Sequence, residues 1–465
     1  MNSNDTIAAL STPLSTGGIG VIRISGQDAI PVVARIFRGK DDILKADTHT
    51  IHYGHIVEDP SVDKLVDNYV DEVLISIMRA PRTYTREDVV EISCHGGIYI
   101  IKKILSLIFE LGVRPAEPGE FTKRAFLNGR IDLSEAEAVM DLISSENESA
   151  RKNAMSQLSG HLKNKIGDFR ERILHETAFI EAALDDPEHY DLSDYEETLQ
   201  IKINELKSEM QHLADTFDEG VFIKEGIKTA IAGRPNAGKS SLLNALLQKD
   251  RAIVTDIPGT TRDTIEENVS LGGMILRLID TAGLRSTADE VERIGVERSL
   301  SSIDEAQLVL YVIDTSEEFT EDDRQQLRDI CRSNGKVIIL LNKSDLGHEF
   351  DQSLLSEYED IPILSVSARE RQGLSDLTST IKDMFFGGEL STDDGFYLTG
   401  ERERNELLFA VRSLDLVLDS IATGMPEDIL TVDLLDAYAA LGRITGEEIE
   451  DDLADRIFSE FCMGK

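Results

Sequence analysis

Residues 233–240 carry the most specific chemical signal in this sequence. They read Gly-Arg-Pro-Asn-Ala-Gly-Lys-Ser, which fits the phosphate-loop pattern GxxxxGK[ST]. An apolar run (IKTAIAG) precedes the helical pattern SSLLNALL, which is the context that the motif needs. The glycines let backbone N–H groups face a β-phosphate, and the helix N-terminus adds its positive end. Lys239 is expected to reach the β- and γ-phosphates, and Ser240 is expected to hold Mg²⁺.

Three further motifs predict which nucleotide binds. Asp280-Thr281-Ala282-Gly283 ends an expected strand, where an Asp meets Mg²⁺ through water and a Gly amide contacts the γ-phosphate. Asn342-Lys343-Ser344-Asp345 ends another strand, and its Asp can accept two hydrogen bonds that guanine donates and adenine does not. Ser367-Ala368-Arg369 follows the last strand and can support the base with amide donors. The four elements in this order predict a GTPase rather than an ATPase.

A threonine-rich segment, Thr255–Asp263, has the position of a first switch loop. By spacing, Thr261 is the expected second ligand of Mg²⁺. A hairpin turn with capping threonines is the alternative interpretation. The predicted GTP-binding residues are Asn236, Ala237, Gly238, Lys239, Ser240, Ser241, Thr255, Asp256, Ile257, Pro258, Gly259, Thr260, Thr261, Asp280, Thr281, Ala282, Gly283, Asn342, Lys343, Asp345, Ser367, Ala368 and Arg369.

The water-activating group of Ras-like enzymes is missing from its usual place. In those enzymes a Gln after DxxG orients the attacking water, and here Leu284 occupies that position. The acidic second switch, Arg285–Gly295, must supply the replacement. No arginine finger is evident in cis, although such a finger is worth about 10³–10⁵ in rate. A monovalent cation or a partner subunit would have to provide that positive charge.

The elements around these motifs predict four segments. Residues 1–122 alternate apolar runs with Gly-rich turns and read as an α+β domain, with strands at 20–24, 71–78 and 88–93 and a helix at 98–109. Residues 123–220 and 389–465 have helical spacing and read as two halves of one helical domain. Residues 221–388 alternate strands and helices, which is typical of a doubly wound parallel sheet inserted between those halves. Its expected strands lie at 229–232, 275–279, 308–313, 337–341 and 363–365.

The charge of the chain is unusual and unevenly distributed. The 465 residues include 48 Lys and Arg against 87 Asp and Glu, a net charge of −39. Residues 1–130 carry 15 basic and 17 acidic side chains, and residues 221–388 carry 19 and 29. The two helical stretches, 131–220 and 389–465, together carry 14 and 41. Such a chain is not expected to bind nucleic acid or anionic membrane through a general basic surface.

Composition also excludes several classes of protein. The three cysteines, Cys94, Cys331 and Cys462, are too few and scattered for a disulfide scaffold or a zinc site. The first residues lack a basic region followed by an apolar run, so we expect no signal peptide. No apolar run approaches the roughly 18 residues of a membrane span. We therefore expect a cytoplasmic protein with reduced thiols.

The chain resembles the MnmE (TrmE) family of tRNA modification GTPases. Besides the GTPase motifs, the resemblance rests on five segments and covers essentially the whole chain. They are DTIAALSTPLSTGGIGVIRISG (5–26), YTREDVVEISCHGG (84–97), PGEFTKRAFLNGRIDL (118–133), DTAGLRSTADEVERIG (280–295) and the C-terminal FCMGK (461–465).

The resemblance implies a function and its partners. Members act with a flavoprotein, MnmG (GidA), to modify C5 of the wobble uridine in certain tRNAs, and a folate supplies the one-carbon unit. The N-terminal domain is implied to bind 5-formyl- or 5,10-methylene-tetrahydrofolate and to form a homodimer. The GTPase domains of the two subunits are implied to approach each other on GTP binding, with K⁺ in place of an arginine finger.

The resemblance also implies roles for individual residues. Asn236, Thr255, Ile257 and the Thr260 position would form the K⁺ site, while Glu292 would orient water through a bridging water. Arg285 would fix the switch, and Pro258 replaces the alanine expected at its position. The implied folate residues are Arg23, Glu87, Arg130 and Lys465.

Two questions stay open at this stage. Cys462 is compatible with a catalytic thiol beside the folate and equally with a small buried residue before the terminus. A ribosome-assembly GTPase, which acts by binding rather than by modification, is the alternative function. The N-terminal domain and the FCMGK end favour tRNA modification, because a ribosome factor has no need of them. A plain folate-dependent aminomethyltransferase does not explain residues 221–388.

Overall fold

The computed structural model of the chain describes residues 5–59, 61–62, 68–186, 189, 195–249, 267–279, 303–347, 350–387, 396–447, 456–459, 461 and 464. The chain divides into two compact units. The first comprises Met1–Met140, Leu162–Arg170 and Ala439–Lys465, and the second comprises Asp141–His161 and Glu171–Tyr438. Long helices contribute residues to both units, so we describe each unit by itself.

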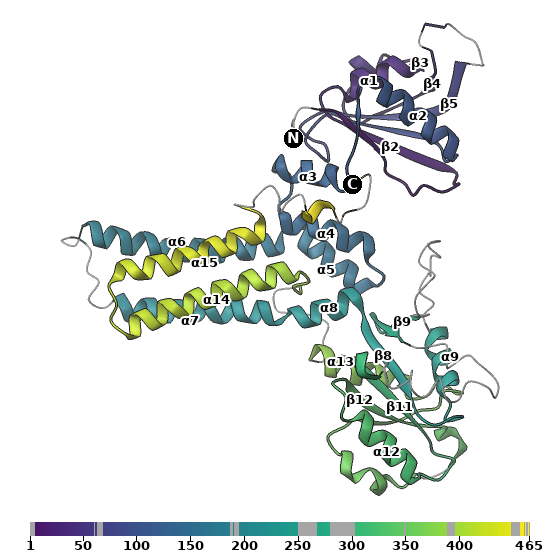
Figure 1. The fold of residues 1–465 in the computed structure, drawn as a ribbon, viewed down its shortest axis with the longest axis vertical. Helices are drawn as coiled ribbons and strands as arrows, with labels where there is room; N and C mark the ends of the chain where they lie inside the picture. The colour runs from purple at the N-terminus through teal and green to yellow at the C-terminus, as the bar shows by residue number, and fades with distance from the viewer. Residues whose placement is uncertain are drawn as a thin grey trace. The chain divides into compact units, whose positions relative to one another are not determined.

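A seven-stranded sheet forms the first unit, in the order β3-β4-β5-β6-β2-β1-β7 (Figure 1). Neighbouring strands are antiparallel, except that β1 and β7 are parallel. The predictions at 20–24, 71–78 and 88–93 are confirmed as β2, β5 and β6. The strands are β1 (Ile7–Leu10), β2 (Ile19–Ser25), β3 (Phe37–Gly39), β4 (Thr50–Val57), β5 (Tyr69–Met78), β6 (Val89–His95) and β7 (Arg114–Pro115).

Helices α1 (Ala29–Ile36) and α2 (Ile98–Glu110) cover one face of this sheet. Val33 and Ile104 from the helices join Ile75 from β5 in one buried core. Along β5 the residues alternate, so Leu74 is 47% exposed on the opposite face. Helix α3 (Glu120–Leu127) follows β7, and the predicted helix at 98–109 is confirmed as α2.

The second unit contains a six-stranded sheet in the order β13-β12-β11-β8-β10-β9 (Figure 1). Five strands match the predicted ones, and their pairs β10-β8, β8-β11, β11-β12 and β12-β13 are parallel. The strands are β8 (Ile227–Ala232), β9 (Glu267–Leu271), β10 (Met274–Leu278), β11 (Leu308–Asp314), β12 (Lys336–Asn342) and β13 (Ile363–Ser365). The edge strand β9 was not predicted and runs antiparallel to β10. Gly272-Gly273 between them is a two-residue hairpin turn, which is the signal that would have identified it.

Helices lie on both faces of this sheet, as the doubly wound prediction requires. Leu242 and Leu246 of α9 (Lys239–Lys249) share one core with α13 (Leu374–Phe386). Leu327 of α12 (Glu321–Ile330) belongs to the core on the other face. The short 3-10 helices η3 (Ser344–Leu346) and η4 (Gln352–Tyr358) follow β12.

The helices predicted before 220 and after 399 are present (Figure 1). In the second unit α7 packs against α14, and Lys207 pairs with Asp415 between them. In the first unit Arg170 of α6 pairs with Glu447, just beyond α15, at 2.7 Å. No helix among the described residues is long and apolar enough to cross a membrane. The helices are α4 (Leu133–Ser144), α5 (Glu148–Leu158), α6 (His161–Asp185), α7 (Tyr195–Asp215), α8 (Phe217–Glu225), α14 (Glu401–Ala422) and α15 (Glu427–Thr445).

Candidate functional site

The phosphate loop lies between β8 and α9, where the sequence predicts it. Gly233 has a φ of +133° and Gly238 a φ of +96°, a region that favours glycine. A Cβ at Gly238 would lie 2.1 Å from Nδ2 of Asn342, so a side chain there would collide. Asn236 has a φ of 62°, and such changes of backbone handedness build anion-binding concavities. The loop therefore fits a phosphate group.

Lys239 and Ser240 open helix α9 beside this loop. The Nζ of Lys239 lies 2.6 Å from the carbonyl oxygen of Gly233 and 2.7 Å from that of Arg234. Burial lowers the pKa of Lys239, and a bound phosphate would stabilise its charged form. Ser240 and Ser241 are exposed at the helix N-terminus, where an anion and its metal would lie.

Asn342 connects the phosphate loop to the segment expected to support the base. This residue is 2% exposed. Its Nδ2 donates to the carbonyl oxygen of Ala237 at 2.8 Å, and its Oδ1 accepts from the N–H of Ala368 at 3.1 Å. Three motifs that are far apart in the sequence are therefore held in one rigid arrangement.

Asp345 is exposed at this junction and is positioned by a neighbouring hydroxyl. The buried Ser367 donates from Oγ to Oδ1 of Asp345 at 2.6 Å. The second oxygen then remains available to a ligand. Lys343 has a φ of 64° and pairs with Asp314 at the end of β11. Arg369 is exposed and lies 4.0 Å from Glu370.

Several predicted site residues lie outside the described residues. They belong to the two switch segments, the motif at 280–283 and the C-terminal FCMGK motif. These residues are Thr255, Asp256, Ile257, Pro258, Gly259, Thr260, Thr261, Asp280, Thr281, Ala282, Gly283, Arg285, Glu292, Cys462 and Lys465.

A cavity of about 540 Å³ opens in the first unit and contains two of the predicted folate residues. Arg23 from β2 and Arg130 after α3 both line it. Its volume lies within the roughly 300–1,000 Å³ usual for small-molecule sites. Its lining residues are Arg23, His49, Met78, Pro81, Arg82, Thr83, Tyr84, Glu91, Arg130 and Val139.

Two guanidinium groups approach the ring of Tyr84 in this cavity. The Cζ of Arg130 lies 4.8 Å from the ring centroid, and that of Arg23 lies 5.5 Å from it. Arg23 also pairs with Glu91 at 2.8 Å, because the β2–β6 register places these two residues opposite each other. Sequence reasoning missed Tyr84 and Glu91. Both residues lie in the segment 84–97 that carries the family resemblance, which could have marked them as site candidates. Only the strand register shows that Glu91 faces Arg23.

The C-terminal end of the chain reaches the same strand. The carbonyl oxygen of Gly464 accepts from Nη1 of Arg23 at 3.4 Å and from Oγ of Ser11 at 3.1 Å. Gly464 has a φ of +85°, and a Cβ there would lie 2.3 Å from the carbonyl oxygen of Leu10. A glycine at this position therefore lets the end of the chain approach β1 closely.

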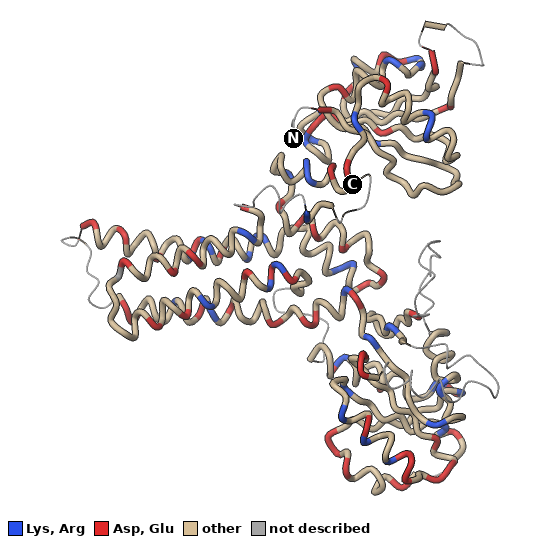
Figure 2. Tube along the Cα trace, in the orientation of Figure 1, with Lys and Arg blue, Asp and Glu red and all other residues tan. Residues whose placement is uncertain are grey.

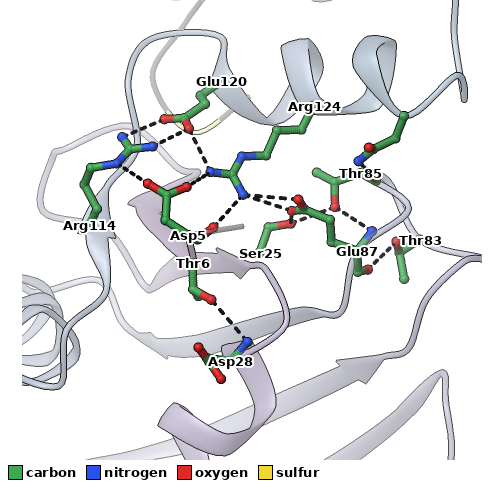
Figure 3. Close-up of polar contacts among 11 residues, drawn as sticks. Asp5, Thr6, Ser25, Asp28, Thr83, Thr85, Glu87, Arg114, Glu120 and Arg124 are labelled. Atoms are coloured by element: carbon green, nitrogen blue, oxygen red, sulfur yellow. Dashed lines mark hydrogen bonds and ion pairs between the residues drawn. The ribbon is translucent and has the colours of Figure 1, made fainter. Parts of the chain in front are cut away.

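Glu87, the third predicted folate residue among those described, faces a different group of charges (Figure 3). Its carboxylate lies 3.2 Å from Nη1 of Arg124 and accepts from Oγ of Ser25 at 2.7 Å. Glu87 is not among the residues that line the cavity. Glu87 contacts the cavity lining through its backbone, because its carbonyl oxygen accepts from Oγ1 of the lining residue Thr83 at 2.6 Å.

Arg124 is the centre of a buried ion-pair network (Figure 3). Its side chain is 9% exposed and also contacts Asp5 at 2.6 Å and Glu120 at 3.0 Å. Arg114 binds the same two carboxylates, Asp5 at 2.8 Å and Glu120 at 2.6 Å. The network ties the start of β1 to β7 and α3.

This network predicts a loss of stability in acid. The hydrogen bond from Arg114 lowers the pKa of Asp5, against the effect of burial. Burial by itself would raise the pKa of Glu120, but hydrogen bonds from Arg114 and the Glu117 N–H outweigh it and lower that pKa. A carboxylate whose pKa is lowered by folding stabilises the fold at pH values above its unfolded-state pKa, which is near 4. It loses this contribution as the pH falls through its lower folded-state pKa.

We therefore expect the melting temperature to fall between pH 5 and pH 3, and Glu120→Gln to reduce that dependence. Thermal unfolding followed by circular dichroism across this range measures both. Asp132 has the opposite tendency, because burial raises its pKa. The quantity to compare is therefore the difference in melting temperature between the unaltered protein and Glu120→Gln at each pH. Identical pH profiles would show that the network does not act this way.

The two described thiols have no catalytic setting. Cys94 is buried, and burial raises its pKa to about 11. Burial also raises the pKa of Cys331, which is half-buried. Both thiols therefore stay protonated at neutral pH, as expected of structural cysteines.

The sequence matches known proteins over almost its entire length. Residues 6–130 match the family description "GTP-binding protein TrmE N-terminus", and residues 133–462 match "MnmE helical domain". A protein of Lachnoclostridium phytofermentans named tRNA modification GTPase MnmE is 50% identical over 99% of both chains. Proteins of the same name from Enterococcus faecalis and Bacillus mycoides are 48% and 47% identical over 99% of this chain, and cover 98% and 99% of their own lengths. With one family description covering more than half of the chain and relatives aligned over 99% of it, this chain belongs to the MnmE (TrmE) family of tRNA modification GTPases.

Proposed function

We propose that this protein hydrolyses GTP and acts with a flavoprotein of the MnmG (GidA) type to modify C5 of the wobble uridine in certain tRNAs. The group added is carboxymethylaminomethyl or aminomethyl, and a folate supplies its one-carbon unit. The observation that carries the proposal is the presence of two sites in one chain. One is the phosphate loop joined to Asp345 through Asn342, and the other is the cavity of Arg23, Tyr84 and Arg130.

The described residues support GTP as the nucleotide. The loop at 233–238 and the N-terminus of α9 would bind the phosphates, with Lys239 supplying positive charge. Asp345 would read the guanine edge, because its carboxylate accepts two donors. Ser240 would hold Mg²⁺ together with Thr261. The bound metal supplies charge neutralisation at the β- and γ-phosphate oxygens.

The cavity supports 5-formyl- or 5,10-methylene-tetrahydrofolate as its ligand. Arg23 and Arg130 suit the carboxylates of a folate tail, and the ring of Tyr84 offers a flat apolar face. The contact of the Gly464 carbonyl oxygen with the lining residue Arg23 supports a role for the C-terminal motif in folate binding. Lys465 follows Gly464 directly and Cys462 precedes it by two residues, and their roles rest on the family resemblance.

An apolar sheet face supports the homodimer. Ile51 and Tyr53 on β4 and Leu74 on β5 are 67%, 58% and 47% exposed, on the face opposite α1 and α2. Such neighbouring apolar side chains mark an interaction surface. A second copy of the chain is the proposed occupant. Light scattering of the full chain tests this, and a monomer at micromolar concentration would contradict it.

The charge of the chain indicates how tRNA is bound. Acidic residues outnumber basic ones, 41 to 14, in residues 131–220 and 389–465, and Figure 2 shows many of them along helices α6, α7, α14 and α15. A polyanion gains little from such a surface. The partner protein should therefore provide most of the phosphate contacts.

Potassium dependence is a direct test of the proposed GTPase mechanism. We expect hydrolysis to be at least about tenfold faster in K⁺ than in Na⁺ at matched ionic strength. The cation would replace an arginine finger, which raises the rate of hydrolysis about 10³–10⁵-fold. Asn236→Gly removes the proposed side-chain ligand and tolerates the φ of 62°, so it should abolish the difference. Phosphate release in KCl, NaCl and choline chloride measures this. Equal rates in K⁺ and Na⁺ for the unaltered protein would count decisively against the K⁺ site.

The wobble nucleoside of cellular tRNA tests the function as a whole. A strain that lacks this protein should lose the C5-modified wobble uridine, and the intact gene should restore it. A gene encoding Lys239→Ala should fail to restore it, because the phosphate loop loses its cation. Nucleoside analysis by mass spectrometry gives the answer. Unchanged tRNA in the deletion strain would favour a switch GTPase that acts by binding, such as a ribosome-assembly factor.

A further inference from the structure

Two exposed side chains that line the cavity in the first unit, His49 and Arg82, have no role in the proposed function, and we call these two residues the rim. Arg23, Tyr84, Glu91 and Arg130 contact one another inside it. His49 and Arg82 line the same cavity but take no part in those contacts.

The rim leaves positive charge without a partner. Three arginines line the cavity against one carboxylate, and that carboxylate, Glu91, is paired with Arg23. Arg82 is exposed and makes no hydrogen bond or ion pair with any residue that the structure describes. The cavity therefore has donors for more anionic groups than Arg23 and Arg130 would bind.

His49 is held in an unusual backbone conformation at this rim. Its φ is 60°, a region that costs a residue other than glycine about 1–3 kcal/mol. Its N–H donates to the carbonyl oxygen of Ile77 at 2.7 Å, which fixes the backbone just before β4. Strained residues of this kind cluster at ligand-binding sites.

The ring of His49 is fixed by a neighbouring hydroxyl. Its Nδ1 lies 2.8 Å from Oγ1 of Thr48, and that oxygen accepts from the N–H of Arg79 at 2.9 Å. The Thr48 hydroxyl keeps its own proton to donate. A neutral ring that accepts this proton at Nδ1 carries its proton on Nε2, which is then a donor toward an anion.

We propose that His49 and Arg82 bind the additional γ-linked glutamates of a polyglutamylated folate. This rests on the proposed binding of folate in the cavity. Each further glutamate adds one carboxylate beyond those that Arg23 and Arg130 would hold. The rim offers an imidazole N–H and a guanidinium to such groups, so it sets a preference for tail length.

Calorimetric titration of the full chain with mono- and triglutamate forms of 5-formyl-tetrahydrofolate tests this inference. We expect the triglutamate to bind about 5–10-fold more tightly, as for exposed charge pairs, with the difference falling at high salt. Arg82→Ala and His49→Gly should each reduce the ratio to about 2–3-fold, because one of the two groups remains, and leave the monoglutamate affinity within about twofold. Glycine suits the backbone at 49, so that variant removes only the ring.

Arg35→Ala is the matched control, because Arg35 is exposed on α1 and outside the cavity. It should keep the preference for the triglutamate. Equal affinity for the two ligands, or an equal loss of the triglutamate preference in Arg35→Ala, would overturn the role of the rim. Binding of the monoglutamate would in that case leave the folate proposal intact. Failure of both ligands to bind, with GTP binding intact, would overturn the folate proposal and the rim with it.

Discussion

Asp345→Asn should convert the nucleotide preference of this protein from guanine to xanthine. The carboxylate of Asp345 would accept hydrogen bonds from N1–H and the exocyclic amino group of guanine. An amide presents a donor where guanine also has one, whereas xanthine carries a carbonyl oxygen at that position. Charge-assisted hydrogen bonds are worth about 1.5–3 kcal/mol each, so we expect GTP affinity to fall by at least about 10²-fold.

Competition of GTP and xanthosine triphosphate against a fluorescent nucleotide measures this change. Asp360→Asn is the control, because it removes the same charge from an exposed position on the same sheet domain. Ser367→Ala should give a smaller loss, since it frees Asp345 from its 2.6 Å hydrogen bond without removing the carboxylate. Retention of guanine preference in Asp345→Asn would refute the assignment of the base-reading residue.

Arg124→Met should strongly destabilise the first unit. Asp5 and Glu120 would keep Arg114, but the carboxylate of Glu87 would retain only the hydroxyl of Ser25 as a partner among the described residues. Removing one partner of a buried ion pair costs about 3–5 kcal/mol, because the other charge is left uncompensated. For a unit of this size we expect a fall of about 10 °C in melting temperature.

Calorimetry of the full chain measures this loss for the first unit. Lys102→Met is the matched control, since it removes one positive charge from an exposed position on α2 and should change stability by less than about 0.5 kcal/mol. Arg124→Lys should lie between the two, because an ammonium keeps the charge but cannot contact three carboxylates as a guanidinium does. Equal melting temperatures for Arg124→Met and Lys102→Met would show that the ion-pair network does not stabilise the first unit by the expected amount.

The order of the described nucleotide-site motifs along the sheet was readable from the sequence. The chemistry of this site lies in short contiguous motifs, and each motif carries its own backbone requirement. Gly238 is one example, where both the positive φ and the contact with Asn342 exclude a side chain. Strand and helix periodicity then fixed the order of these motifs along the doubly wound sheet, and the same sheet is observed.

The cavity of the first unit was only partly readable. Arg23 and Arg130 were identified through the family resemblance, but nothing local indicates that Glu91 faces Arg23. That pairing follows from the β2–β6 register, a relation between residues far apart in the sequence. The edge strand β9 differs from this case, because the Gly272-Gly273 turn that joins it to β10 is a local signal for a hairpin.

The sequence by itself determined the phosphate-loop motif, the place of Asp345 after its strand and the layered fold class, because these depend on local patterns and backbone sterics. Only the tertiary structure decided the partners of the charged side chains in the first unit. A glutamate such as Glu87 can bind a ligand or form an ion pair within the protein. In the folded chain its carboxylate forms an ion pair with Arg124. The physical reason is that a buried charge must be compensated by whichever opposite charge the packing brings near it.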